Sequence, residues 1–238
     1  MYTPQNMTSR LLRDTQIARG PDEFDGVQVT YTNPNAWEDA VVMALLPGDA
    51  QNKVLKITAV GVTDRVRAWR VGMRRRRAMR FRTDAFQFGT ELDALNSRYW
   101  SYCAAADDVP GYGQSAILRG LETIAGNLVM TSGEPFDWSA GGSHVVALRR
   151  QDGTVCGPFA ATRINDFTLS IVGDPLDFDP VITPFGGIEP THMLFGPIER
   201  WSYPVLISSI EPSGLESASV SAVNYAPEVY LDDNGSPP

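Results

Sequence analysis

The 238-residue sequence predicts an α+β fold that is mostly antiparallel β, with small barrel or sandwich domains and one arginine-rich helix packed on a sheet. Short apolar segments recur about every ten residues between turns rich in Gly and Pro, which is typical of small antiparallel barrels and sandwiches. Only residues 62–82 show the period of an amphipathic helix. The apolar fraction of 43% is that of a folded globular protein.

The predicted helix is marked by one apolar stripe and a start signal. The stripe consists of Val62, Val66, Trp69 and Met73, of which the last three are expected to pack on a sheet. Thr63 or Asp64 can cap the first turn with a side-chain oxygen. Gly72 costs the helix about 1 kcal/mol relative to Ala, so packing must compensate. After Arg80 the period changes to two, which predicts a strand over residues 81–88.

The same stretch separates the charges of the chain. It holds nine Arg and one Asp, a net charge of +8, whereas the whole chain carries −8 and the remainder therefore −16. Only two Lys are present, so the positive charge is planar guanidinium, which suits bidentate pairing with carboxylates at interfaces. We expect docking onto an acidic surface of a neighbouring subunit, through Arg65, Arg67, Arg70, Arg74, Arg75, Arg76, Arg77 and Arg80. The alternatives are a solvated face paired with nearby carboxylates, and nucleic-acid binding.

Four segments are expected along the chain. They are a polar N-terminal arm (1–25), a sheet-plus-helix domain (26–90), a β-barrel-like domain (91–226) and a C-terminal linker (227–238). In the second segment, Val27, Val29 and Tyr31 alternate on one face of a first strand, and further strands are expected at 40–46 and 53–60. No run approaches the 18 apolar residues of a membrane-spanning helix, so no membrane insertion is expected.

The third segment begins ambiguously and then becomes regular. Leu92 and Leu95 favour a helical turn, whereas the aromatic residues of 99–102 favour a strand. A loop is expected at 107–115 because of its Pro and Gly content. The expected strands that follow lie at 116–124, 127–132, 144–150, 154–164, 167–172, 192–198, 203–212 and 218–225.

An internal echo lies within these strands. Residues 128–138 (LVMTSGEPFDW) align with residues 168–178 (TLSIVGDPLDF) at an offset of 40. The two histidines, His144 and His192, open the strands that follow each copy. Two copies are too few for a solenoid. The echo predicts a pair of related strand-turn-strand units within one barrel.

Catalytic patterns are weak, and we expect no enzyme activity, cofactor or metal. His144 and His192 have no ligand at metal spacing, and Cys103 and Cys156 are expected to be buried free thiols rather than a disulfide. Five carboxylates could supply a glycosidase acid and base, but they lie in turns that favour Asp for geometry alone. These carboxylates are Glu134, Asp137, Asp174, Asp177 and Asp179. The five scattered Trp residues are expected to anchor separate parts of the core.

The order of these segments resembles a known family. Residues 25–42 (DGVQVTYTNPNAWEDAVV), the helix 62–82 followed by ELDAL, and residues 107–120 (DDVPGYGQSAILRG) are similar to the central part of lambda-type phage tail tip attachment (host-specificity, J-type) proteins. These are the tail hub proteins of long-tailed phages and gene transfer agents. Residues 188–233 are similar to the end of the hub in that family.

The resemblance implies a fold and a role. The fold would consist of small β-barrel-like hub domains in a pseudo-symmetric ring, and the chain would form a homotrimer that closes the tail tube at the virion tail tip after assembly in the host cytoplasm. Its partners would be other tail proteins: the distal tail ring, the tail tip and the central fibre. Family members usually carry hub domains before this segment and fibronectin-type domains after it, so a longer or split hub is expected.

The expected function is therefore a structural component of the phage tail tip or baseplate hub, connecting the tube to distal host-recognition parts. One alternative is a tail-associated cell-wall hydrolase that uses the acidic turns. The other is a nucleic-acid-binding module that uses the arginine-rich helix, although no specific nucleic-acid binding is expected because Arg is present almost without Lys.

Overall fold

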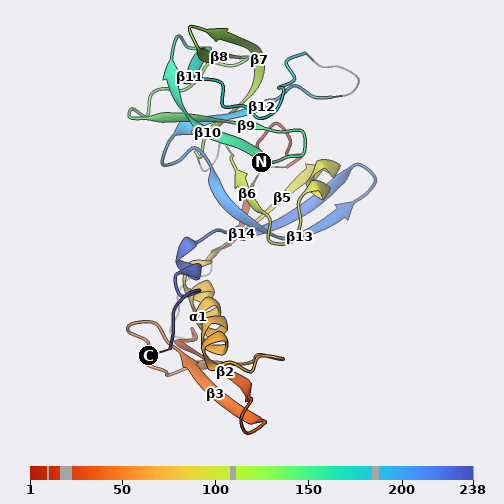
Figure 1. Cartoon of the computed structure of the whole chain (residues 1–238). Coiled ribbons are helices and arrows are strands. Elements are labelled where there is room, and N and C mark those ends of the chain that lie inside the picture. The colour runs from red at the N-terminus through yellow and green to blue at the C-terminus, as the bar shows by residue number, and fades with distance from the viewer. Residues whose placement is uncertain (10, 17–22, 108–110, 184–187, 238) are drawn as a thin grey trace. The chain divides into compact units, whose positions relative to one another are not determined.

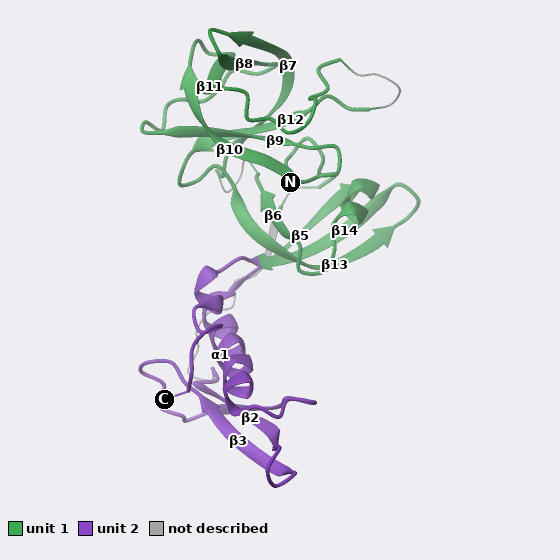
Figure 2. Cartoon of the chain, in the orientation of Figure 1, with its two compact units in different colours: residues 1–14, 86–223 green, residues 15–85, 224–238 purple. Residues whose placement is uncertain are grey.

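The computed structural model describes residues 1–9, 11–16, 23–107, 111–183 and 188–237. Parts of the predicted arm (10 and 17–22) and of the predicted loop (108–110), and the last residue of the predicted linker, lie outside this set. The chain forms two compact units, shown in Figure 2. Unit 1 contains Met1–Asp14 and Phe86–Val223, and unit 2 contains Thr15–Ala85 and Asn224–Pro238. The predicted class, mostly antiparallel β with one α-helix among the described residues, is confirmed.

Unit 2 is a three-stranded sheet with helix α1 on one face (Figure 1). The strands are β2 (Gly26–Asn33), β3 (Glu38–Ala44) and β4 (Val54–Thr58), and their order is β3-β2-β4. β2 pairs antiparallel with β3 and parallel with β4. As the alternation predicts, Val27, Val29 and Tyr31 are buried on the face that packs against the helix.

Helix α1 spans Arg65–Phe81 and begins at the predicted cap, because the Asp64 carboxylate accepts a hydrogen bond from the Arg67 amide at 2.7 Å. Its buried residues are Ala68, Trp69, Gly72, Met73 and Arg76. Trp69 and Met73 confirm the predicted stripe, whereas Val66 is only partly buried. A Cβ added at Gly72 would lie 2.7 Å from both Ala44 Cβ and Val29 Cγ2. Gly72 therefore marks the closest approach of helix and sheet, which is the compensation that its low helix propensity requires.

The strand after the helix starts later than predicted. Strand β5 spans Asp84–Glu91, because the helix continues to Phe81. Its buried face carries Phe86 and Phe88, as the alternation predicts. The ambiguous stretch resolves into a short 3₁₀ helix, η1 (Leu92–Asn96), and strand β6 (Tyr102–Ala105). None of the described helices is long and apolar enough to span a bilayer.

Unit 1 contains a five-stranded sheet with the order β1-β5-β14-β13-β6. Its other strands are β1 (Leu12–Gln16), β13 (Tyr203–Ser213) and β14 (Ser217–Asn224). The two C-terminal strands, which the sequence places in the barrel-like domain, join this sheet instead. The first residues of the predicted arm are also part of the unit, since Tyr2 is buried and bridges to Ala105.

The remaining strands of unit 1 close a six-stranded barrel in the order β10-β11-β8-β7-β12-β9 (Figure 1). The strands are β7 (Gln114–Ile124), β8 (Asn127–Ser132), β9 (His144–Arg149), β10 (Val155–Arg163), β11 (Thr168–Val172) and β12 (His192–Pro197). The interior is filled by large apolar side chains, among them Leu118, Met130 and Phe195. The predicted barrel is thus present, but it covers only the central part of the predicted domain.

The internal echo lies in this barrel as predicted, with one difference in register. The echoed strands β8 and β11 pair with each other, and so do β9 and β12. After the turns, Trp138 and Phe178 both pack on the barrel core, which preserves the offset of 40. In the strands, however, the inward residues are Leu128 and Met130 in one copy and Leu169 and Ile171 in the other, an offset of 41. Because side chains alternate along a strand, equivalent sequence positions there face opposite sides of the barrel wall.

Candidate functional site

The candidate site is the surface of helix α1, on which the arginine side chains have three different environments. One guanidinium group faces the sheet, several contact the C-terminal segment of the same unit, and others face outward. The helical period of 3.6 residues distributes adjacent arginines of the run 74–77 among these environments. The eight predicted interface residues therefore do not form one surface.

Arg76 belongs to the buried side of the helix, not to an exposed face. Its Nε and Nη2 atoms donate to Asp49 Oδ2 and Oδ1 at 2.8 and 2.6 Å, and the two side chains are only 6% and 3% exposed. Burial opposes ionisation of Asp49, but the hydrogen bonds from Arg76 and from the Leu46 amide outweigh it and lower the pKa of the carboxyl group. Conversely, the hydrogen bond to Asp49 raises the pKa of Arg76. Its role is to join the helix to the turn that follows β3.

The predicted C-terminal linker lies along α1. Residues Pro227–Tyr230 form a 3₁₀ helix, η2, that packs on α1. Further on, Asp233 accepts two hydrogen bonds from Arg74, from Nε at 3.2 Å and from Nη2 at 2.5 Å. Asp232 accepts one from Arg77 Nε at 2.5 Å. This acidic segment therefore neutralises part of the arginine surface within the unit.

Polar and aromatic contacts complete this attachment. The Gly235 carbonyl accepts a hydrogen bond from Arg70 Nε at 2.8 Å, and the Tyr230 hydroxyl accepts one from Arg82 Nη2 at 2.7 Å. The guanidinium groups of Arg74 and Arg82 lie 5.3 and 5.6 Å from the centre of the Tyr230 ring, within the range of cation–π attraction. The segment is thus held by charge, hydrogen bonds and ring contacts together.

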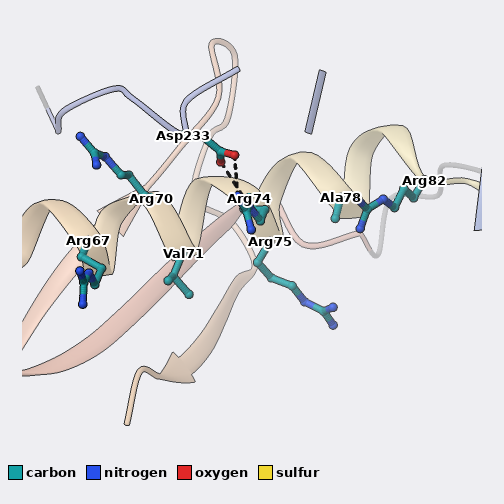
Figure 3. Close-up of a pocket in the computed structure, with 8 residues that line it drawn as sticks. All are labelled: Arg67, Arg70, Val71, Arg74, Arg75, Ala78, Arg82 and Asp233. Atoms are coloured by element: carbon teal, nitrogen blue, oxygen red, sulfur yellow. Dashed lines mark hydrogen bonds and ion pairs between the residues drawn. The ribbon is translucent and has the colours of Figure 1, made fainter. Parts of the chain in front are cut away.

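A third face of the helix is open, and we call Arg67, Val71 and Arg75 the open stripe. These residues follow one another at steps of four and project from the same side of the helix in Figure 3. They lie in a groove of about 680 Å³ whose lining residues are Arg67, Arg70, Val71, Arg74, Arg75, Ala78, Arg82 and Asp233. Within the part of the chain that the structure describes, the Arg67 and Arg75 side chains make no hydrogen bond or ion pair, and Val71 is 41% exposed.

The remaining predicted interface residues differ from one another. Arg65 is exposed and its side chain has no hydrogen-bond or ion-pair partner among the described residues. Arg80 is partly buried and has an interaction within the described residues. Arg67 and Arg75 of the open stripe, together with Arg65, are therefore the predicted interface residues that are exposed and have no side-chain partner among the described residues.

Two comparisons with known proteins found no match. No protein-family model matches the chain, and no curated protein matches it. The resemblance to tail hub proteins accordingly rests on the sequence segments given above.

The two histidines do not share an environment. His144 lies on the inner side of the barrel wall, where its ring stacks on Phe195 at 5.2 Å and contacts Trp138 at 5.0 Å. His192 lies on the outer side, because the alternation of β12 turns its neighbours Met193 and Phe195 inward. The matching sequence positions therefore do not create a paired site. No group of three or more His, Cys, Asp or Glu residues among those described could hold a metal ion.

We expect His192 to make unit 1 sensitive to acid. Burial, assisted by nearby Arg149, lowers the pKa of His192 from 6.5 to about 4. The Glu189 carboxylate lies 3.4 Å from His192 Nε2, but its side chain is 65% exposed, so solvent screens the attraction. Because the folded pKa is below the unfolded one, the unfolded state binds the proton more tightly. The contribution of His192 to the free energy of unfolding is then fully present above pH 6.5. It falls by up to roughly 3 kcal/mol as the pH decreases towards 4.

Urea unfolding between pH 4 and 7 measures this effect. A His192→Gln variant should lose the part of the pH dependence that lies between pH 4 and 6.5, and the histidine titration followed by NMR should give a pKa well below 6.5. Identical pH slopes in the two proteins would contradict this role of His192.

Two carboxylates of the hydrolase alternative, Asp137 and Asp177, have a lowered pKa. Arg150 donates from Nε and Nη2 to Asp177 at 3.0 and 2.8 Å, which lowers the pKa of Asp177. Hydrogen bonds from Ser139 lower the pKa of Asp137. A glycosidase general acid needs a raised pKa, so both shifts have the wrong direction.

The cysteines lie where the sequence predicts them, whereas the tryptophans do so only in part. Cys103 and Cys156 are buried free thiols, as predicted. Trp69 is a buried anchor, but Trp37 and Trp100 are 78% and 43% exposed, so the prediction that every Trp anchors a core is wrong. Trp37 and Trp100 both have positive φ (54° and 63°), which places them at turns instead of in packed strands.

Proposed function

We propose that this chain is a structural component of a phage tail tip or baseplate hub, present in three copies around the tail axis. In this role it closes the tail tube and connects it to the distal host-recognition parts. The observation that carries the proposal is the open stripe of α1, a docking surface on a chain whose sequence resembles tail hub proteins. The neighbouring partners would be the distal tail ring, the tail tip and the central fibre.

The chemistry of the open stripe suits a protein surface. Two guanidinium groups without partners among the described residues flank a half-exposed valine, and arginine around an apolar centre is typical of protein interfaces. On the adjacent face of the helix, Arg74 and Arg77 already bind carboxylates of the acidic segment, and Arg74 also lies over an aromatic ring. A neighbouring acidic surface would continue this pattern around the helix.

Reconstruction of the intact tail tip tests the proposal. We expect three copies of the chain around the tail axis, and we expect Arg67→Glu with Arg75→Glu to prevent incorporation into tails. The control is Arg119→Glu with Arg163→Glu, which makes the same charge change on exposed residues of unit 1. One copy per tail, an off-axis position, or normal incorporation of the Arg67/Arg75 variant would overturn the proposal.

Nucleic-acid binding is the second candidate, because the open stripe is cationic. Neutralising only two or three phosphates gives a salt slope of about −2 to −3, which corresponds to weak binding near physiological salt. We therefore expect little binding of the purified chain to duplex DNA in a fluorescence titration. Tight, steeply salt-dependent binding that is lost in the Arg67/Arg75 variant, with tail assembly intact, would reverse the assignment.

A further inference from the structure

We propose that the open stripe of α1 receives the tip of the β13–β14 hairpin from a second copy of this chain. The inference rests on the proposed docking role of the stripe and names its partner. Its basis is a match in charge and in apolar character between two exposed features, one in each unit.

The two units differ in charge. Unit 1 contains eight Arg, no Lys and 17 Asp and Glu, which gives a formal charge of −9. Unit 2 contains 12 Lys and Arg and 11 Asp and Glu, which gives +1. The acidic character of the chain therefore belongs to unit 1, whereas the open stripe, whose guanidinium groups have no partner among the described residues, belongs to unit 2. An electrostatic contact between copies would join unit 2 of one copy to unit 1 of another.

The hairpin tip of unit 1 is the acidic feature that also carries an exposed apolar side chain. Leu215 is 92% exposed, the highest exposure among the large hydrophobic residues described. It follows Gly214, whose φ of +81° makes the turn, and Glu216 comes directly after it. Glu211, at the end of β13, is also exposed. A solvated leucine between two carboxylates has no structural role within its own hairpin.

The open stripe has the matching arrangement, with an apolar side chain between two positive charges. Arg67 and Arg75 are two helical turns apart, about 12 Å along the axis, and Val71 lies between them. A leucine placed on Val71 and Ala78 would bring the two glutamates towards the two arginines. Covering the apolar side chains would also exclude water from the ion pairs and strengthen them relative to isolated surface pairs.

The geometry determines the type of assembly. The two surfaces are different patches, so the contact is heterologous, and each copy offers one surface to each of two neighbours. Such a contact closes into a ring if the rotation between copies permits it, which is compatible with the three-fold arrangement proposed above. A two-fold dimer would instead require both stripe–tip contacts to form at once between the same two copies.

A charge-swap experiment tests this inference on the full chain. Three variants are compared with the wild type: the stripe variant Arg67→Glu/Arg75→Glu, the tip variant Glu211→Arg/Glu216→Arg, and the combined variant with all four changes. Sedimentation velocity over a range of protein concentrations, at low and high ionic strength, measures self-association. Urea unfolding of each variant verifies that both units remain folded.

We expect the wild type to self-associate at low salt and less at high salt. The stripe and tip variants should each associate at least about tenfold more weakly, and an equimolar mixture of them should associate again. The combined variant should recover self-association, because its reversed charges still match. Leu215→Ser should weaken association without changing the salt dependence.

Three results would overturn the inference. They are a wild type that stays monomeric at every concentration, a tip variant that associates like the wild type, and a combined variant that does not recover. Failure of the proposed function is distinguishable, because it is measured in tails. If the stripe variant is excluded from tails but the tip variant is incorporated normally, the docking role stands and this partner is wrong. If self-association in solution behaves as expected but the chain is absent from the tail axis, the contact between copies stands and the proposed function is wrong.

Discussion

Replacing Arg76 with alanine should destabilise unit 2 by about 3–5 kcal/mol, because the substitution leaves the Asp49 carboxylate buried without its partner. The pair is almost fully removed from water, so the desolvation cost of Asp49 is no longer offset. Because a chain with two compact units need not unfold in one step, a single global transition is not the right measure. Amide hydrogen exchange in α1 and β2 reports unit 2 alone and should show reduced protection.

The control replaces both partners. Arg76→Met with Asp49→Leu removes both charges and fills the space with apolar atoms, and it should recover most of the lost stability. Exchange in the barrel strands should be the same in all three proteins. A single Arg76→Ala variant as protected as the wild type would show that the pair is solvated and contributes little. Charge reversal of Arg74, Arg76 and Arg77 is unsuitable as a test of docking, because it would break their ion pairs with Asp233, Asp49 and Asp232.

The sequence predicts the helix well because its signals are local. The Asp64 cap and the spacing of Trp69 and Met73 lie within a few turns of one another. The sequence analysis predicts Arg76 at an interface because its guanidinium group is polar. However, Arg76 lies seven residues after Trp69 and three after Met73, on the same side of the helix. The position of Arg76 on the apolar side of the helix is the sequence feature that indicates its burial. What the local pattern could not supply was the distant partner, Asp49.

The segments described as arm and linker differ from the structure for a related reason. Both have low apolar content, so neither shows the periodicity that marks a packed element. In the arm, Thr3 and Asn6 are buried polar residues. Asn6 Oδ1 accepts from the Thr3 amide at 2.8 Å, and Asn6 Nδ2 donates to the distant Asp93 Oδ2 at 3.1 Å. In the C-terminal segment, Asp232 and Asp233 are held by arginines more than 150 residues earlier in the chain. Hydrogen bonds and ion pairs with distant residues produce no periodic pattern in the local sequence.

The barrel shows both the strength and the limit of pattern analysis. The echo correctly placed two related units in one barrel, because turn chemistry and strand length repeat together. It could not show that the strands are shifted by one residue, which turns His144 inward and His192 outward. A single-residue shift changes the face of every side chain in a strand. The pattern also predicts β13 and β14 in the barrel-like domain, although they pair in the five-stranded sheet, because pairing between distant strands depends on tertiary packing.

Replacing Phe195 with alanine should destabilise unit 1 by about 3–5 kcal/mol, because it opens a cavity in the barrel interior. Phe195 is 1% exposed, and its ring lies 4.8 Å from Phe136, 4.7 Å from Trp138 and 5.2 Å from His144, centre to centre. Removing the ring withdraws a contact from each of the three neighbours at once. Amide exchange in β9 and β12 should show the loss, whereas exchange in α1 and β2 should not change.

Two controls separate the cavity from other effects of the substitution. Phe195→Leu keeps most of the buried volume and should cost clearly less than the alanine variant. Ile198→Ala removes an apolar side chain that is 57% exposed three residues later, and it should change stability by no more than about 0.5 kcal/mol. If Phe195→Ala were as mild as Ile198→Ala, the aromatic cluster would not be the packed centre of this barrel. A loss of protection in unit 2 as well would instead mean that the two units share a single unfolding transition.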